Sequence, residues 1–176
     1  MSKYILKKKI IIVGSYAVGK TSILNSFIHR RFEIDYKATL GVNILAKEYQ
    51  LNDEVTVGFT FWDIGGQKLF QHIYPRFFGQ SNAALIVFDV TRMGSFDEIM
   101  TWHASILNYV QTKIPILLLG NKIDLVEQRV VPADMAIDLA KEHDFLYIET
   151  SAKTGKNVDT AFKKLAESIA ERHKNL

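Results

Sequence analysis

The fold is decided by residues 10–21, whose sequence is IIIVGSYAVGKT. The first four residues are apolar, as in a strand that enters the buried middle of a sheet, and an apolar face at 20–29 predicts a helix. The glycines between them complete the pattern G-x-x-x-x-G-K-[ST]. In this pattern backbone N–H groups surround a phosphate, Lys20 neutralises the outer phosphates and the Thr21 hydroxyl binds Mg²⁺. A glycine turn with an incidental lysine is the alternative, which the strand–turn–helix context disfavours.

The rest of the chain alternates between strand-like and helical segments. Residues 43–51 and 55–63 predict an antiparallel hairpin, because a short polar turn joins two strand-like runs. The order predicts an α/β fold: a mostly parallel six-stranded sheet with one antiparallel edge strand and helices on both faces. Without an internal repeat or linker, residues 1–176 are expected to form a single domain. Strands are predicted at 4–13, 43–51, 55–63, 83–89, 114–121 and 145–149, and helices at 20–29, 96–111, 132–143 and 157–172.

Composition excludes several classes of protein. The 176 residues are 48% apolar and 23% charged, which is typical of one ordinary globular domain. Scattered basic residues leave a net charge of only +3, so we expect no nucleic-acid partner. The chain has no cysteine and no apolar run long enough to span a membrane. We therefore expect a cytoplasmic protein, peripheral to membranes only if a lipidated tail is missing from this chain.

A second polar cluster, Asn121-Lys122-Ile123-Asp124, follows the buried strand predicted at 114–121. A carboxylate at Asp124 can accept both the ring N–H and the exocyclic amine of guanine, whereas adenine presents an acceptor at the ring position. Ligands of such sheets bind at the carboxyl ends of the strands, where this cluster and the phosphate loop both lie. The two motifs together predict a guanine nucleotide, although Asn-Lys-Ile-Asp alone is an ordinary polar turn.

A third cluster, Asp63-Ile64-Gly65-Gly66-Gln67, follows the second strand of the hairpin. Asp63 can hold Mg²⁺ through water, the Gly66 N–H can reach a γ-phosphate, and Gln67 can orient an attacking water. The alternative is a helix N-cap aspartate beside a glycine turn. The phosphate loop favours the functional interpretation.

These motifs, with Thr39 in the loop after the first helix and Thr150-Ser151-Ala152-Lys153, resemble a Ras-superfamily small GTPase in order and spacing. The match covers essentially the whole chain. The Rab branch is the most similar, from residues 40–43, Trp62, residues 88–91 and residues 95–96. By contrast, Ile64-Gly65-Gly66 stands where Thr-Ala-Gly is usual and is similar to the Arf branch.

The resemblance implies the G-domain fold of P-loop NTPases and a Mg²⁺-dependent switch that binds and hydrolyses GTP, slowly without an activating protein. Exchange factor, activating protein and effectors would bind at residues of about 32–44 and 62–79. The implied catalytic residues are Lys20, Gly66 and Gln67, and the Mg²⁺ ligands are Thr21, Thr39 and Asp63. The implied nucleotide-binding residues are Gly14, Ser15, Tyr16, Ala17, Val18, Gly19, Lys20, Thr21, Ser22, Phe32, Thr39, Gly66, Asn121, Lys122, Asp124, Ser151, Ala152 and Lys153.

The resemblance also implies individual roles around the base. Phe32 would pack against the base, the Ala152 N–H would meet the guanine carbonyl, and Lys122 and Lys153 would lie along base and ribose. Ile44, Trp62 and Phe77 occupy the positions of the aromatic triad with which Rab proteins bind effectors. A partly buried core cluster is the alternative for these three residues.

Tyr16 is a departure from the family, which usually has a small residue there. One hypothesis is that its ring crowds Gln67 or an incoming arginine and slows hydrolysis; another is that it points outwards without effect. The first favours a GTP-binding docking module with little hydrolysis as an alternative function. A small-metabolite kinase would leave Asn121 and Asp124 unexplained. The five histidines are expected to be isolated, without a second metal ligand.

Overall fold

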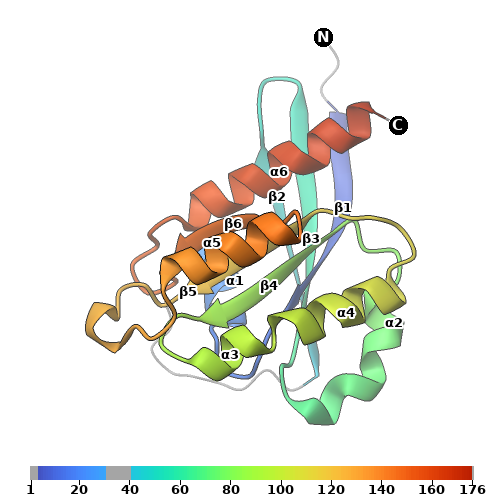
Figure 1. Ribbon diagram of the computed structural model, residues 1–176. Helices are drawn as coiled ribbons and strands as arrows, with labels where there is room; N and C mark the ends of the chain where they lie inside the picture. Colours follow the sequence, from blue (N-terminus) through green and yellow to red (C-terminus); the bar gives the residue numbers. More distant parts are fainter. Residues whose placement is uncertain (1–3, 31–40, 176) are drawn as a thin grey trace.

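A six-stranded sheet with the order β2-β3-β1-β4-β5-β6 forms the centre of the molecule (Figure 1). The computed structural model describes residues 4–175 except 31–40, and the side chains of Leu69 and Phe70 are also outside the description. β2 is antiparallel to β3 and all other neighbours are parallel, which confirms the predicted fold class. The strands are β1 (Tyr4–Val13), β2 (Val42–Gln50), β3 (Val55–Ile64), β4 (Ala83–Asp89), β5 (Ile116–Asn121) and β6 (Leu146–Thr150).

Helices cover both faces of this sheet because the central strands are apolar on both sides. In β1, Ile10 and Ile12 pack on one face with α1 and α6, whereas Ile11 and Val13 pack on the other with α2, α4 and α5. No residue of β4 is exposed. The helices are α1 (Lys20–His29), α2 (Tyr74–Phe78), α3 (Met93–Asp97), α4 (Ile99–Tyr109), α5 (Ala133–Glu142) and α6 (Val158–Lys174), with 3-10 turns η1 (Lys68–Ile73) and η2 (Val126–Gln128).

Two helical regions differ from the sequence prediction. The single helix expected at 96–111 is wrong, because α3 already begins at Met93 and α4 follows it after Glu98. Ser95 explains the early start: its Oγ accepts the Asp89 N–H at 2.9 Å and donates to the Arg92 carbonyl at 2.7 Å. The turns η1 and α2 were not predicted, since each is too short to show a helical period.

Strand ends agree within two residues, and the differences have local causes. β5 begins at Ile116 rather than at residue 114. Pro115 has no N–H with which to join the ladder, so the strand begins after it. Within the part of the chain that the structure describes, we find no helix that combines the length and the apolar character needed to cross a membrane.

Candidate functional site

The phosphate loop between β1 and α1 requires its two glycines. Gly14 has φ 144°, and a Cβ added there would lie 2.2 Å from the Val87 carbonyl oxygen. Gly19 has φ 100°, and a Cβ there would lie 2.3 Å from Asn121 Nδ2. Both positions therefore exclude a side chain by conformation and by contact. The loop is packed against β4 on one side and against the end of β5 on the other.

Lys20, the first residue of α1, is a buried cation inside this loop. It is 6% exposed, and its Nζ donates to the carbonyl oxygens of Gly14 at 2.9 Å and Ser15 at 3.0 Å. Burial lowers the pKa of Lys20 to about 8, with a smaller opposing effect from Asp63 and a further lowering by Arg92. A phosphate beside Nζ would favour the charged form again, because an opposite charge raises the pKa of an amine.

Thr21 and Asp63 bring the end of β3 against the start of α1. The Thr21 hydroxyl donates to the Asp63 carboxylate, which is fully buried. Hydroxyl and carboxylate oxygens suit Mg²⁺, which is usually held by one or two carboxylates together with substrate phosphates. Residues 4–30 and 41–175 contain no group of three His, Cys, Asp or Glu side chains that could hold a metal ion. The donor set therefore fits Mg²⁺ shared with a phosphate better than an all-protein metal site.

A cavity of about 390 Å³ lies beside the phosphate loop, at the ends of β5 and β6. It is the place where the expected base-binding residues meet the loop. Its size is in the range of small-molecule sites. The residues that line it are Ala17, Gly19, Ser22, Asn121, Lys122, Asp124, Leu125, Ala152 and Lys153.

Asn121 holds the walls of this cavity together. Its Nδ2 donates to the Val18 carbonyl at 3.0 Å, and its Oδ1 accepts the Thr150 hydroxyl at 3.3 Å and the Ala152 N–H at 3.1 Å. The side chain is 1% exposed, so these bonds are made away from water. The Ala152 N–H, expected to meet a guanine carbonyl, thus donates to Asn121 in this structure.

Lys122 is a second cross-link from the same segment. Its Nζ donates to the Ala17 carbonyl at 2.9 Å and lies 2.7 Å from the Asp89 carboxylate. Burial works to raise the pKa of Asp89, but hydrogen bonds from Lys122 and Thr91 outweigh it and lower that pKa. Asp89 therefore remains a charged partner for Lys122. Sequence reasoning assigned Lys122 to the base and did not identify this ion pair.

Asp124 is oriented by Ser151. The Ser151 hydroxyl donates to Asp124 Oδ1 at 2.6 Å, and Ser151 itself is fully buried. Such a short bond to a charged acceptor fixes the plane of the carboxylate. Oδ1 can accept a second hydrogen bond, and Oδ2 is also an acceptor. The carboxylate can therefore accept two parallel N–H groups from a ligand.

Gly66 and Gln67 lie on the other side of the phosphate loop. A Cβ added at Gly66 would lie 2.4 Å from the Gly14 carbonyl oxygen and 2.6 Å from the Tyr16 nitrogen, so the chain after β3 rests directly on the loop backbone. Gly66, Gln67 and Tyr16 all line a second cavity, of about 830 Å³. Tyr16 is 43% exposed, so its ring lies at the border of this cavity rather than inside the core.

The sequence analysis did not identify two residues that contact the phosphate loop. Arg92 Nη2 donates to the Tyr16 carbonyl, and the Ser15 hydroxyl donates to the Glu98 carboxylate. Both partners follow β4, at the same sheet edge as the loop. The sequence did contain a signal for Arg92, because a charged residue three positions after the end of a buried strand is placed near the ligand-binding edge of the sheet. No such signal marked Glu98.

The remaining expectations have mixed outcomes. Phe32 and Thr39 lie outside the described residues. Trp62 and Phe77 are in contact, with ring centroids 5.5 Å apart, and both pack partly buried against the core. Ile44 is 51% exposed and pairs with Trp62 across β2 and β3. The three positions are thus adjacent, and they combine a partly buried aromatic pair with an exposed aliphatic side chain.

Two of the histidines expected to be isolated along the sequence lie side by side in the fold. His103 and His143 have ring centroids 5.6 Å apart, and both rings contact Phe145. The two residues are distant in sequence and come together because α4 and the end of α5 are neighbours, which no helix or strand spacing reveals. Burial, followed by the neighbouring His143, lowers the pKa of His103.

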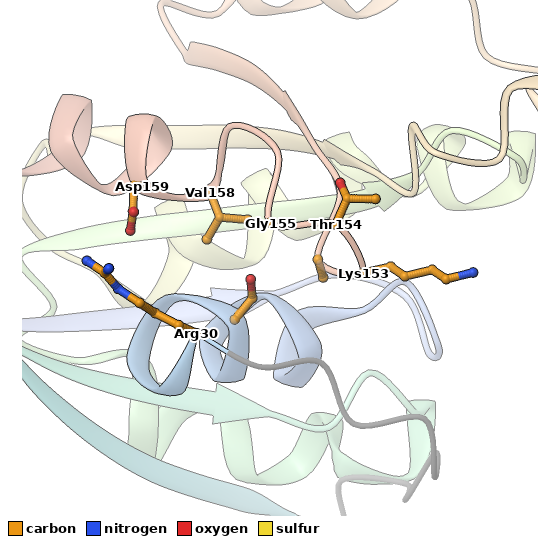
Figure 2. A pocket seen from close by; sticks show the side chains of 8 residues that line it. Arg30, Lys153, Thr154, Gly155, Val158 and Asp159 are labelled. Atoms are coloured by element: carbon orange, nitrogen blue, oxygen red, sulfur yellow. The ribbon is translucent and has the colours of Figure 1, made fainter.

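A smaller cavity of about 260 Å³ adjoins the base side of the site, between α1 and the loop that leads to α6. Figure 2 shows Arg30, at the end of α1, and Asp159, at the start of α6, on one side of it. Lys153 extends away from Arg30 at the other end. Ala152 and Lys153 line this cavity and the base cavity alike, so their loop separates the two.

The glycine loop before α1, the Thr21–Asp63 pair and the neighbouring cavity lined by Asp124 have the arrangement expected of a nucleotide-binding α/β domain. The Ras family model matches residues 9–171. Ras-related protein Rab-7b from Bos taurus is 40% identical over 171 residues, and its Homo sapiens counterpart is 38% identical, each covering 96% of this chain and 84% or 85% of the relative. The chain therefore belongs to the Ras family of small GTPases and is a Rab-like, GTP-binding switch protein.

Proposed function

We propose that this protein, as a single G domain over residues 1–176, binds GTP with Mg²⁺ and hydrolyses it to GDP and phosphate, changing its partner surface as it does so. The observation that carries the proposal is the network around Asn121, which joins the phosphate loop to the base cavity. One ligand with both a phosphate chain and a base fits this joined arrangement. Asp124, held by Ser151, selects guanine through two parallel hydrogen bonds.

Hydrolysis requires an in-line attack of water on the γ-phosphorus. A bond forms from the water oxygen, the bond to the bridging oxygen breaks, and GDP leaves with that electron pair. The attacking water releases a proton to solvent or to a phosphate oxygen, and the products are GDP and inorganic phosphate. Gln67 orients the water, the Gly66 N–H meets a γ-phosphate oxygen, and Lys20 neutralises charge on the transferred group. Thr21, Thr39 and Asp63 would hold Mg²⁺, which would neutralise further charge on the phosphate chain.

Turnover is expected to be slow without an activating protein. Among the described residues, Arg92 is an arginine that is hydrogen-bonded to the phosphate loop, because it donates to the Tyr16 carbonyl. That bond directs its guanidinium at the loop backbone rather than at a bound phosphate. An arginine from a partner would supply the missing charge, as in other GTPases that respond to activating proteins.

The exchange factor, the activating protein and effectors are proposed to bind around residues 32–44 and 62–79. In this region Ile44 is exposed beside the Trp62–Phe77 pair, as protein-binding surfaces require. A role in membrane trafficking or signalling follows from the Rab-like membership. It would place the protein in the cytoplasm, peripheral to membranes.

The bound nucleotide provides the direct test. The protein is purified without added nucleotide and denatured, and the released compound is identified by anion-exchange chromatography. Stoichiometric GDP supports both the guanine site and turnover. Adenine nucleotide, or no nucleotide even after incubation with GTP and Mg²⁺, would contradict the role given to Asp124.

A docking module that binds GTP but scarcely hydrolyses it is the second candidate, favoured by Tyr16. Tyr16 and Gln67 line the same cavity, and in this interpretation the ring restricts the glutamine or an incoming arginine. Single-turnover hydrolysis by Tyr16→Gly tests this interpretation. A rate that rises at least about tenfold supports crowding by Tyr16; an unchanged rate, with and without an activator, leaves the ring without this role.

A further inference from the structure

His103 and His143 lie side by side at the edge of the sheet opposite the nucleotide cavity. His103 is on α4, and His143 directly follows the last residue of α5. Both helices pack on the same face of the sheet (Figure 1). A cavity of about 350 Å³ adjoins the two rings, next to Ile116, which begins β5, and Phe145, which precedes β6. The pair is therefore remote from the phosphate loop and the base cavity, which lie at the carboxyl ends of the strands.

Both imidazole rings have nitrogen atoms that can take a ligand. Within the part of the chain that the structure describes, neither ring makes a hydrogen bond, and Glu142 Oε1 lies 4.0 Å from His143 Nε2. Both rings are partly exposed, so an ion from solvent can reach them. Burial, followed by the neighbouring His143, lowers the pKa of His103, so at neutral pH its ring is uncharged and keeps a lone pair.

The separation of the two rings suits a metal ion between them. Zn²⁺ binds an imidazole nitrogen at about 2.0–2.1 Å, and two such bonds at a tetrahedral angle place the ring centres about 5–6 Å apart. The centroids of His103 and His143 are 5.6 Å apart, and the rings are inclined at 66°. Rotation about the Cβ–Cγ bond, which is a broad torsion, directs a nitrogen of each ring at the ion. Phe145 contacts both rings, with centroids at 4.9 and 5.6 Å, and so keeps them together.

The charges around the pair permit a cation. Lys113 and Arg172 also line the cavity. Lys113 Nζ, however, lies 3.3 Å from the Asp144 carboxylate, and Arg172 Nη1 donates to the Lys113 carbonyl at 3.1 Å. With Glu142 beside His143, two carboxylates balance the two positive side chains. His143 also follows the carboxyl end of α5, where the helix dipole favours positive charge.

We propose that His103 and His143 together bind one Zn²⁺ ion. Imidazole nitrogen is a preferred ligand of zinc, whereas Mg²⁺ prefers oxygen. Because residues 4–30 and 41–175 contain no group of three His, Cys, Asp or Glu side chains that could hold a metal ion, the two histidines supply two ligands and water supplies the others. A bound ion would join α4 to α5 at the sheet edge away from the nucleotide. The proposal concerns this pair alone and does not depend on GTP hydrolysis.

Titration with Zn²⁺ tests the site. The protein is used with the nucleotide it carries and with excess Mg²⁺, which occupies oxygen sites, and binding is measured by isothermal titration calorimetry. We expect one Zn²⁺ per chain, and an affinity at least about tenfold lower in His103→Gln and in His143→Gln, because loss of even an outer-shell partner of a metal costs about 10–100-fold. His29→Gln changes an exposed histidine on α1 and is the matched control, with unchanged Zn²⁺ affinity.

A second measurement needs no variant. In long-range ¹H–¹⁵N spectra of the imidazole rings, the His103 and His143 signals should shift together as one equivalent of Zn²⁺ is added, while those of the other histidines stay in place. The melting temperature should rise with Zn²⁺ in the parent and not in either variant of the pair, since the ion binds the folded pair. A shift of only one of the two rings would overturn the proposal. So would parent-like Zn²⁺ affinity in His103→Gln or His143→Gln, or loss of Zn²⁺ binding in His29→Gln.

Discussion

The two sides of the phosphate loop are built differently. On the base side, Asn121, Lys122 and Asp124 each have a hydrogen bond to another loop, at 3.0, 2.9 and 2.6 Å. On the other side, Gly66 rests on the loop by close backbone packing, and Gln67 Oε1 is buried with no hydrogen-bond partner among the residues that the structure describes. The segment at the end of β5 is therefore tied to its neighbours by directional bonds, whereas Gly66 is tied to the phosphate loop by close packing.

This difference separates recognition from switching. Directional bonds between loops fix the base cavity before any ligand arrives, so binding costs little reorganisation. A segment that is held by packing and makes few hydrogen bonds gives up less favourable interaction free energy when it moves. In the proposed function, the rigid part of the structure would bind the base and the adaptable part would sense the γ-phosphate.

The largest effect is expected from Asp124→Asn, which tests the rigid side. Asparagine can still accept the Ser151 hydroxyl, but its NH₂ opposes one of the two guanine N–H groups. We expect GDP affinity to fall by about a thousandfold, as when a polar pocket is left unpaired. Displacement of fluorescent GDP measures the loss. Ser151→Ala frees the carboxylate and also removes the hydrogen bond that the Thr154 N–H donates to Ser151 Oγ, and it should cost about tenfold. Unchanged GDP affinity in Asp124→Asn would refute guanine selection by this residue.

Gly66→Ala tests the adaptable side. The added Cβ would lie 2.4 Å from the Gly14 carbonyl oxygen, so the segment must move off the phosphate loop. We expect hydrolysis to slow by about tenfold or more while GDP affinity changes little, because the base cavity is held independently. Gly79→Ala is the matched control, since a Cβ there meets nothing within 4 Å. Equal effects of the two substitutions on single-turnover hydrolysis would refute the expected distinction.

The pH dependence of binding probes the loop between the two sides. Burial lowers the pKa of Lys20 to about 8, and phosphate favours its protonated form, so nucleotide affinity should fall as pH rises above about 8, by at most about tenfold per unit. Conversely, the stability of the nucleotide-free protein should rise between pH 8 and 10.5, where the unfolded lysine binds the proton and the folded one does not. Lys20→Met should bind weakly with no such slope, and a slope that persists in it would exclude Lys20 as the cause.

The smallest effect is expected from Arg92→Ala. It removes the hydrogen bond to the Tyr16 carbonyl, but Arg92 is exposed and its bond competes with water. We expect GDP release to accelerate only about twofold to threefold. Arg76→Ala, an exposed arginine on α2, is the control in a stopped-flow release assay. An acceleration as large as that of Asp124→Asn would mean that the loop depends on Arg92 as much as on the base cavity.

Sequence predicted the strands and the local motifs because each is recorded in a short stretch of chain. The run at 10–21 specifies strand, loop and helix together. Asp124 can be recognised because it ends the Asn121-Lys122-Ile123-Asp124 motif. What escaped prediction depends on contacts between distant segments. The Lys122–Asp89 ion pair, the Arg92 bond to Tyr16 and the His103–His143 contact join residues that are distant along the chain. The early start of α3 has a local cause, the hydrogen bonds of the Ser95 side chain, which no helical period records.

The bond from Asn121 to the Val18 carbonyl also has a consequence for how the chain folds. It joins residues 103 positions apart, and the Asn121–Ala152 bond adds a loop of 31 more. Contacts of such high sequence separation form late and slow the search for the native topology. A nascent chain therefore acquires the complete base cavity only after β6 has paired with β5. Guanine nucleotide would then stabilise the product of this last folding step, because only that state contains the complete base cavity.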